Sequence, residues 1–246
     1  MNGQKYTLAR DPHDHRDNLY SHASSTPLPK RVDLSPGCSP VENQGQLGSC
    51  TGNGLVGVME FLEKKSGAKV VDLSRLFVYF NERNMEGTVN QDAGANIRDG
   101  VKTLAKFGVC AEALWPYDVA KFKQKPSDSC YVEAKTRTIS QYSRITSLDG
   151  MKHCLAEGYP IVMGFTVFES FESEAVAKTG VVAMPLPGEK CLGGHCVVAV
   201  GYDEDAQTIL CRNSWGESWG QKGYFTLPYG YITNPKLSSD FWTIRK

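Results

Sequence analysis

One cysteine stands where a glycine-containing loop runs into a predicted helix, and this junction constrains the chain more than any other feature. The loop occupies residues 44–49, and Cys50 follows it directly. After Cys50, apolar residues recur at helical spacing until two lysines and Gly67. We therefore expect a helix that begins at or just after Cys50. Its first-turn N–H groups and the positive end of its dipole would favour a thiolate, as a nucleophile requires.

Gln44 precedes Cys50 across this loop. Its side-chain amide can fold back beside the sulfur. Together with the backbone N–H of Cys50, it would donate to an oxyanion that develops on an attacked carbonyl. Taken alone, the stretch also fits a buried cysteine with a purely structural role at a helix start. Residues elsewhere in the chain must decide between these two interpretations.

Charge and hydropathy exclude several classes of protein. The 246 residues include 27 basic and 27 acidic side chains, which gives a formal net charge of zero. We therefore expect neither a nucleic acid nor a membrane surface as a partner. No apolar run approaches a membrane span, and residues 1–17 lack the hydrophobic segment of a signal peptide. As written, the chain is expected to be a soluble, cytoplasmic monomer, with export by another route left open.

Eight cysteines raise the question of a disulfide framework or a metal site. Their spacing is irregular, with no close CxxC pair and no His/Cys cluster at zinc spacing. We therefore expect reduced, mostly buried thiols and neither a metal nor an organic cofactor. The cysteines stand at positions 38, 50, 110, 130, 154, 191, 196 and 211.

Residues 1–40 differ from the rest of the chain. A charged, turn-rich run occupies residues 11–17, and prolines recur up to Pro40. This pattern predicts an extended arm instead of a folded unit. His13 and His15, with the aspartates around them, can be interpreted as a metal site. A solvated charged segment is the preferred interpretation.

Residues 41–135 show mainly helical patterns. Besides the helix at Cys50, we expect one at residues 73–83. A further helix is expected to start near Ile97, with Asn96 as a cap and Gly108 as its end.

Residues 136–246 show a different pattern, rich in β-branched and aromatic residues. One short helix is expected at residues 147–157, with Ser147 as its cap. The sequence thus predicts an α+β protein in which a helical lobe and a β lobe meet along a cleft. Strands are expected at residues 161–167, 196–202, 208–212 and 223–227.

His195 and Asn213 supply the chemistry that Cys50 would need. His195 follows two glycines at the start of a predicted strand, where no side chain blocks approach to the imidazole. Near neutral pH an imidazole can accept the thiol proton and then give a proton to a leaving amine. Asn213 can accept from one ring N–H and orient the ring, and Trp215 can shield that bond from water. Each residue alone is equally typical of a packed core. Only the combination with Cys50 indicates catalysis.

Together these segments resemble the papain family of cysteine peptidases, which has the order Gln, Cys, His, Asn. The motif Asn-Ser-Trp-Gly-Glu-Ser-Trp-Gly at residues 213–220 is similar to the family's own, and Gly-Tyr-Phe at residues 223–225 continues it. The likeness extends from about Pro40 to the end. It implies a two-lobed fold, with a helical left lobe at residues 41–135 and an antiparallel β-barrel right lobe at residues 136–246.

The resemblance also implies a role for each matching residue. Cys50 would be the nucleophile, His195 the base and acid, and Asn213 the residue that orients the imidazole. Gln44 would donate to the oxyanion. Substrate-binding positions would be Gly48, Gly94 and Gly194, which hold the peptide backbone, together with Trp215 and Trp219, the latter on the leaving-group side.

Several features depart from the family's usual pattern. Thr51 replaces a tryptophan, and Leu47 replaces a cysteine that forms a disulfide in many relatives. Gly194 stands where many relatives have Asn or Asp. Residues 1–40 are short for an inhibitory propeptide of this family. We nevertheless expect them to bind in the cleft and restrain activity, as in a zymogen, because they directly precede the active-site loop.

The sequence therefore predicts a papain-like cysteine endopeptidase that hydrolyses polypeptides through a thiolate and an acyl-enzyme, with exopeptidase action as a variant. A transglutaminase or acyltransferase would use the same Cys–His pair but pass the acyl group to an acceptor other than water. An amidase would use the pair to cleave another kind of amide bond. A catalytically silent relative that only binds is the remaining alternative.

Overall fold

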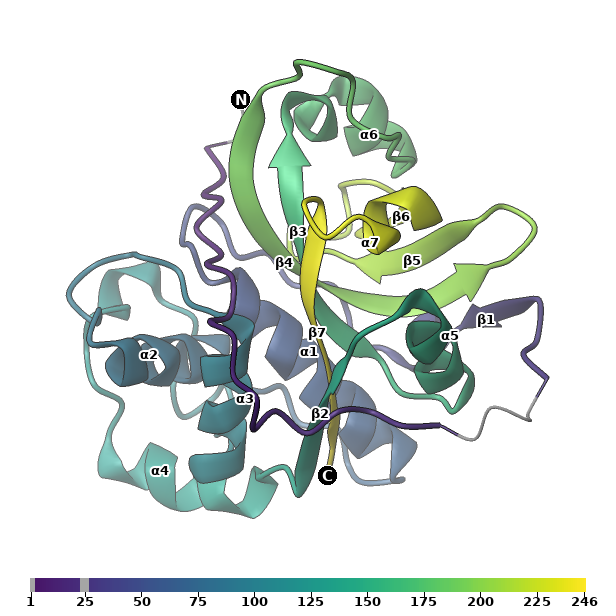
Figure 1. The fold of residues 1–246 in the computed structure, drawn as a ribbon. Coiled ribbons are helices and arrows are strands. Elements are labelled where there is room, and N and C mark those ends of the chain that lie inside the picture. The colour runs from purple at the N-terminus through teal and green to yellow at the C-terminus, as the bar shows by residue number, and fades with distance from the viewer. Residues whose placement is uncertain (1–2, 23–26) are drawn as a thin grey trace.

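Helix α1 (Cys50–Lys65) lies between the other helices of the first half and a sheet formed mainly by the second half (Figure 1). The computed structural model describes residues 3–22 and 27–246. Residues 50–63 of α1 are buried, as expected for a helix with packed neighbours on several sides. Gly52 allows the next helix to approach closely, because a β-carbon there would stand 2.8 Å from the carbonyl oxygen of Arg75.

Helices dominate the first half, as the sequence pattern predicts. Ser74 caps α2 by accepting a hydrogen bond from the N–H of Phe77. Asn96 caps α3 by accepting from the N–H of Asp99, so the cap predicted at Asn96 is confirmed. The helices that follow α1 are α2 (Arg75–Glu86), α3 (Ile97–Lys106) and α4 (Asp128–Ala134).

A seven-stranded antiparallel sheet in the described part of the chain forms most of the second half. β7, the last strand in the sequence, pairs with β2 on one side and β3 on the other. The strand order is β2-β7-β3-β4-β5-β6, and β1 pairs with β4. The strands are β1 (Arg31–Asp33), β2 (Gln141–Ile145), β3 (Ile161–Phe168), β4 (Cys191–Asp203), β5 (Thr208–Arg212), β6 (Tyr224–Pro228) and β7 (Ser238–Arg245).

Strand β4 begins earlier than predicted. We expected a strand at residues 196–202 with His195 at its entrance, but His195 lies within β4, paired with Phe165 of β3. Glycine weakens a strand on its own. Here the hydrogen bonds offered by β3 extend the pairing through the glycines that precede His195.

The second half holds more helix than the sequence indicates. The one helix expected there is α5 (Leu148–Ala156), with the predicted cap at Ser147. Two further helices, α6 (Glu174–Thr179) and α7 (Tyr229–Thr233), were not predicted. Both are too short to show a helical period in the sequence. None of the helices in residues 3–22 and 27–246 combines the length and apolar character needed to cross a bilayer.

The hydrophobic core joins the two halves. One buried cluster contains Leu55 and Met59 of α1 together with Val198 of β4 and Trp242 of β7. A second cluster packs on the sheet and includes the aromatic side chains near residues 213–220. The expected α+β arrangement, helices on one side and an antiparallel sheet on the other, is confirmed.

The charged arm, residues 3–22, follows the boundary between the helices and the sheet and then crosses β2 (Figure 1). His13, His15 and Arg16 are exposed, as expected for a solvated charged segment, but the side chains of Asp11 and Asp17 are not. The side chain of Asp11 is 0 % exposed, and its carboxylate accepts from Arg144 at 2.8 Å and from the indole of Trp242 at 2.7 Å. Asp17 pairs with Arg98 of α3 and with Arg144 of β2. Buried carboxylates need such partners, so tertiary contacts decide where this run lies.

Candidate active site

Cys50 is the first residue of α1, as the sequence predicts. Ser49 precedes it as the N-cap residue, and its backbone carbonyl accepts from the side-chain amide of Asn53 at 2.9 Å. The hydroxyl of Ser49 lies 2.5 Å from that of Tyr117, which donates to the carbonyl oxygen of Gln44 at 2.9 Å. These bonds fix the loop that leads into the helix.

The protonation of Cys50 differs from our expectation. The side chain is 1 % exposed, and burial raises the pKa of its thiol to about 12. Backbone N–H groups of Cys196, Thr51 and Cys50 itself act in the opposite direction but do not compensate. The position at the helix start was expected to give a thiolate, yet desolvation outweighs the helix N-terminus in this conformation.

His195 and Asn213 form the pair that the sequence predicts. His195 Nε2 lies 2.8 Å from Asn213 Oδ1, so the ring carries its proton on Nε2 and keeps a lone pair on Nδ1. Nδ1 is buried and has no hydrogen-bond partner among the described residues. Burial lowers the pKa of His195 to about 4, although the bond to Asn213 acts to raise it. The imidazole is therefore neutral at pH 7 and available as a base.

Trp215 stacks on His195, with 5.2 Å between ring centroids and 29° between planes. The predicted shielding of the His195–Asn213 bond stays a prediction. Trp219 packs edge-on against Trp215, with 5.1 Å between centroids, and in a tilted arrangement against Phe171 at 5.4 Å. Both tryptophans are 6 % exposed. Their expected contact with substrate stays a prediction, whereas their packing supports the histidine from the core side.

Gln44 connects the Cys50 loop to the Asn213 loop. Its side-chain carbonyl accepts from the hydroxyl of Ser214 at 2.5 Å, and its amide donates to the carbonyl oxygen of Leu47 at 3.0 Å. A backbone bond from Gln44 N to Ser214 O, 2.9 Å long, adds a third link. The amide group has two hydrogens, so one remains for an oxyanion.

The three glycines predicted to hold a peptide backbone all lie against the arm. A β-carbon on Gly48 would stand 2.4 Å from the hydroxyl of Thr7, and one on Gly94 would stand 2.2 Å from the carbonyl oxygen of Thr7. A β-carbon on Gly194 would stand 2.6 Å from the carbonyl oxygen of Leu8. Only glycine lets a chain approach this closely.

The arm also makes strand-like bonds here. Leu8 N donates to Gly194 O at 3.1 Å, and Thr7 pairs with Gly194 in a parallel bridge. The ring of Tyr6 lies edge-on to His195, with 6.1 Å between centroids. Its hydroxyl donates to Glu172 at 2.6 Å. The arm therefore crosses the His195 side of the site in extended form.

Asp92 is a site residue that sequence reasoning missed. Its carboxylate accepts from the N–H of Gly48 at 3.0 Å, from the hydroxyl of Tyr79 at 2.6 Å and from the amine of Lys5 at 2.5 Å. It thereby joins the Cys50 loop, α2 and the arm. The only signal in the sequence was its place two residues before Gly94. Ser214 and Tyr117, which fix Gln44, were missed as well.

Comparison with known proteins identifies the family. A sequence model of the papain family cysteine proteases matches residues 28–241. The chain belongs to the papain family of cysteine proteases. It is 45 % identical over 229 residues to an uncharacterized peptidase C1-like protein of Acanthamoeba polyphaga mimivirus, covering 89 % of this chain and 73 % of the viral protein.

Solved structures agree with this assignment. Xylellain, a cysteine protease from Xylella fastidiosa, superposes with a TM-score of 0.94 at 40 % identity, over 100 % of this chain and 97 % of xylellain. In sequence, chymopapain of Carica papaya is 26 % identical over 221 residues, which is 87 % of this chain and 58 % of chymopapain. The protein is a papain-like cysteine peptidase with the two-lobed papain fold.

Two departures from the papain family pattern have structural explanations. Thr51, in place of tryptophan, donates its hydroxyl to the buried carboxyl group of Glu82 at 2.7 Å. Burial raises the pKa of Glu82 well above its ordinary value, which favours the neutral form of this carboxyl group. Leu47, in place of a disulfide cysteine, is buried beside Leu76 and Tyr79. All eight cysteines are free in this structure, and six of them are buried.

Proposed function

We propose that Cys50 is the nucleophile of this cysteine peptidase and that His195 and Asn213 activate it. His195 Nδ1 takes the proton of the Cys50 thiol while the sulfur forms a bond to the substrate carbonyl carbon. The resulting oxyanion accepts hydrogen bonds from the backbone N–H of Cys50 and the free amide hydrogen of Gln44. His195 then gives its proton to the leaving amine as the C–N bond breaks.

Hydrolysis of the thioester completes the cycle. His195 accepts a proton from water, the hydroxide oxygen bonds to the acyl carbon, and the sulfur leaves as the thiolate. Asn213 keeps the proton on Nε2 throughout, so that Nδ1 remains the exchanging nitrogen. In this proposal the helical part, residues 41–135, carries the sulfur, and the β-rich part, residues 136–246, carries the base.

The observation that carries the proposal is the extended peptide already bound at the predicted positions. Thr7 and Leu8 of the arm lie against Gly48, Gly94 and Gly194. Gly194 forms a backbone hydrogen bond with the arm, and Gly48 and Gly94 leave room for its close approach, so the same surface is suited to another extended backbone. This supports polypeptides as the substrate and an endopeptidase as the mode, since the arm continues on both sides of this contact.

We further propose that the arm restrains activity. Tyr6 covers His195, and Thr7 and Leu8 take up the glycine positions that a substrate would use. The same cover explains why the thiol and the imidazole are both neutral, because burial shifts their pKa values in opposite directions. Release of the arm would admit water and substrate and favour the thiolate–imidazolium pair.

The test of the nucleophile is covalent modification with an epoxide thiol reagent at neutral pH, followed by peptide mapping. We expect the label on Cys50 once the arm has been released. Cys191 is an internal comparison, because it is exposed and reacts by access alone. Labelling that is confined to Cys191 and spares Cys50 in an arm-released variant would refute the assignment. A Cys50→Ser chain gives the background.

A further inference from the structure

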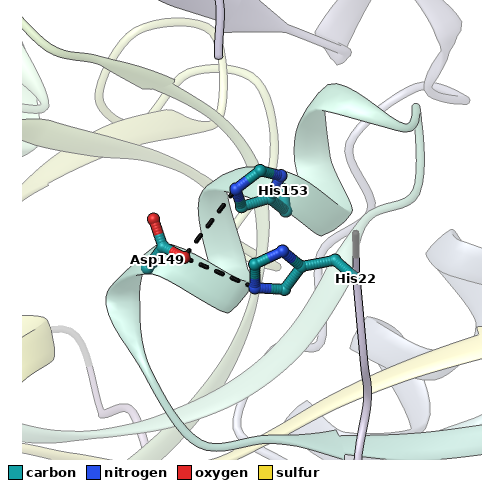
Figure 2. Close-up of side chains that lie close together, drawn as sticks. All are labelled: His22, Asp149 and His153. Atoms are coloured by element: carbon teal, nitrogen blue, oxygen red, sulfur yellow. Dashed lines mark ion pairs between the residues drawn. The ribbon is translucent and has the colours of Figure 1, made fainter. Parts of the chain in front are cut away.

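Two histidines and an aspartate that lie outside the active site meet at the far end of the arm (Figure 2). Asp149 Oδ2 lies 3.4 Å from His22 Nε2 and 3.7 Å from His153 Nε2. The donor atoms of all three residues lie within 4.8 Å of one another. The two imidazole rings are stacked, with 3.8 Å between centroids and 15° between planes.

Tertiary contacts bring these residues together from two distant segments. Asp149 and His153 are four positions apart on α5, so their side chains share one face of that helix. His22 comes from the arm, which is held against β2 by a bond from Tyr20 N to Arg144 O at 2.9 Å and by the Leu19–Arg144 bridge. This backbone pairing places the imidazole of His22 against α5.

The donor atoms of the cluster suit a metal cation. Imidazole nitrogens and a carboxylate oxygen are ligands that zinc takes in proteins. Zinc bonds of 2.0–2.1 Å in tetrahedral geometry place donor atoms roughly 3.3 Å apart. The observed separations of 3.4 and 3.7 Å are close to that value.

We propose that His22, Asp149 and His153 form a binding site for a divalent transition metal of the zinc class. The site takes two imidazole nitrogens and one carboxylate oxygen and leaves a fourth position for water, because the side chain of Asp149 is 63 % exposed. Nothing in the catalytic chemistry uses these residues. Zinc at this place joins the arm to α5.

Binding requires one ring to leave the stack, since lone pairs in nearly parallel ring planes do not converge on one ion. We take His22 as the ring that turns, which costs its stacking on Tyr20 and His153. Its Nδ1 is buried without a hydrogen-bond partner in the described part of the chain, so rotation breaks no bond there. The metal-bound state therefore keeps Asp149 and His153 on α5 in place and turns His22 toward them.

The experiment is calorimetric titration of zinc chloride into the full chain carrying Cys50→Ser, which removes the catalytic thiol as a competing ligand. We expect one zinc ion per chain. His22→Ala and His153→Gln should each weaken binding at least tenfold, and Asp149→Asn should weaken it as well. His15→Ala is the matched control, because it removes a histidine from the same arm outside the cluster, and it should bind zinc as the parent does.

Cobalt(II) supplies a second measurement, because its absorption separates nitrogen and oxygen ligands from thiolates. We expect a spectrum without thiolate charge-transfer bands. Thermal unfolding without metal shows whether each variant folds as the parent does. Equal zinc affinity in the parent and His22→Ala proteins, a thiolate spectrum, or no binding at millimolar zinc would overturn the proposal.

The idea that zinc holds the arm in the cleft rests on the inhibitory function proposed for the arm. It is measured separately from zinc binding. Zinc should slow hydrogen exchange at the amide of Leu8, which donates to Gly194. This readout uses the Cys50→Ser chain and needs no activity. Zinc binding by the cluster can therefore be refuted or supported whether or not the arm proves inhibitory.

Discussion

The carbonyl oxygen of Thr7 lies so close to Gly94 that a β-carbon on this glycine would stand 2.2 Å away. Gly94 has a φ of +72°, a conformation that side chains disfavour, so both the backbone and the contact require glycine here. The chain's own arm thus uses a position that the family resemblance assigns to a bound peptide. The first prediction follows from this contact.

Replacing Leu8 by aspartate should release the arm. Leu8 packs on the core cluster between α1 and the sheet, and burying a leucine contributes about 1.5–3 kcal/mol, so a charge there should raise the open fraction at least roughly tenfold. The rate at which an epoxide reagent modifies Cys50 measures this. Leu19→Asp is the matched control, because Leu19 belongs to the same arm but is 62 % exposed, and it should leave the rate unchanged. Equal rates in both variants would exclude restraint by this segment.

The pKa of His195 should report whether the arm is docked. Burial lowers it to about 4 from an ordinary value of 6.5. Because the pKa of His195 is lowered in the folded chain, its contribution to the free energy of unfolding is complete above pH 6.5. This contribution, about 3 kcal/mol in all, is lost as the pH falls toward 4. Acid should therefore favour the open arm. NMR titration of the His195 ring in the Cys50→Ser chain should give the low value, and the added Leu8→Asp change should raise it.

His195→Gln gives the comparison for this pH effect. Glutamine does not titrate, so the stability of that variant should vary less between pH 6.5 and 4 than that of the parent. Unchanged pH dependence would show that other groups control the acid response.

Asn213→Ala should lower kcat on the order of 10²-fold in the Leu8→Asp background, where the site is accessible. Asn213 Oδ1 lies 2.8 Å from His195 Nε2, and its loss frees the ring to take the wrong tautomer. Asn213→Asp keeps an acceptor oxygen and should retain more activity than Ala. Steady-state kinetics on a fluorogenic peptide measure both. Equal losses in the two variants would indicate a structural role only.

Arg144→Met should destabilise the fold by about 3–5 kcal/mol. Arg144 pairs with the carboxylates of Asp11, Asp17 and Asp240, and removing it leaves the buried carboxylates of Asp11 and Asp240 without their cationic partner. Thermal or denaturant unfolding measures the loss. Arg16→Met is the control, since the Arg16 side chain is 77 % exposed and forms an exposed ion pair with Asp14, and its Tm should equal that of the parent. A parent-like Tm in Arg144→Met would show that these ion pairs contribute little.

Local patterns predicted the helices well because caps and apolar spacing act over a few residues. The helix at Cys50 and the caps at Asn96 and Ser147 are of this kind. β1 and β7 were not predicted, because the strands that pair with them lie far away in the sequence. The early start of β4 has the same cause.

The sequence by itself determined the family, the order of Gln44, Cys50, His195 and Asn213, and the elements that carry them, since these depend on residue type and short spacing. Tertiary structure alone decided that Thr7 and Leu8 lie on the glycines of the site. It also decided that the thiol and the imidazole are neutral beneath the arm. The physical reason is that burial and its effect on charge depend on which distant segments pack together, and a linear pattern carries no measure of that.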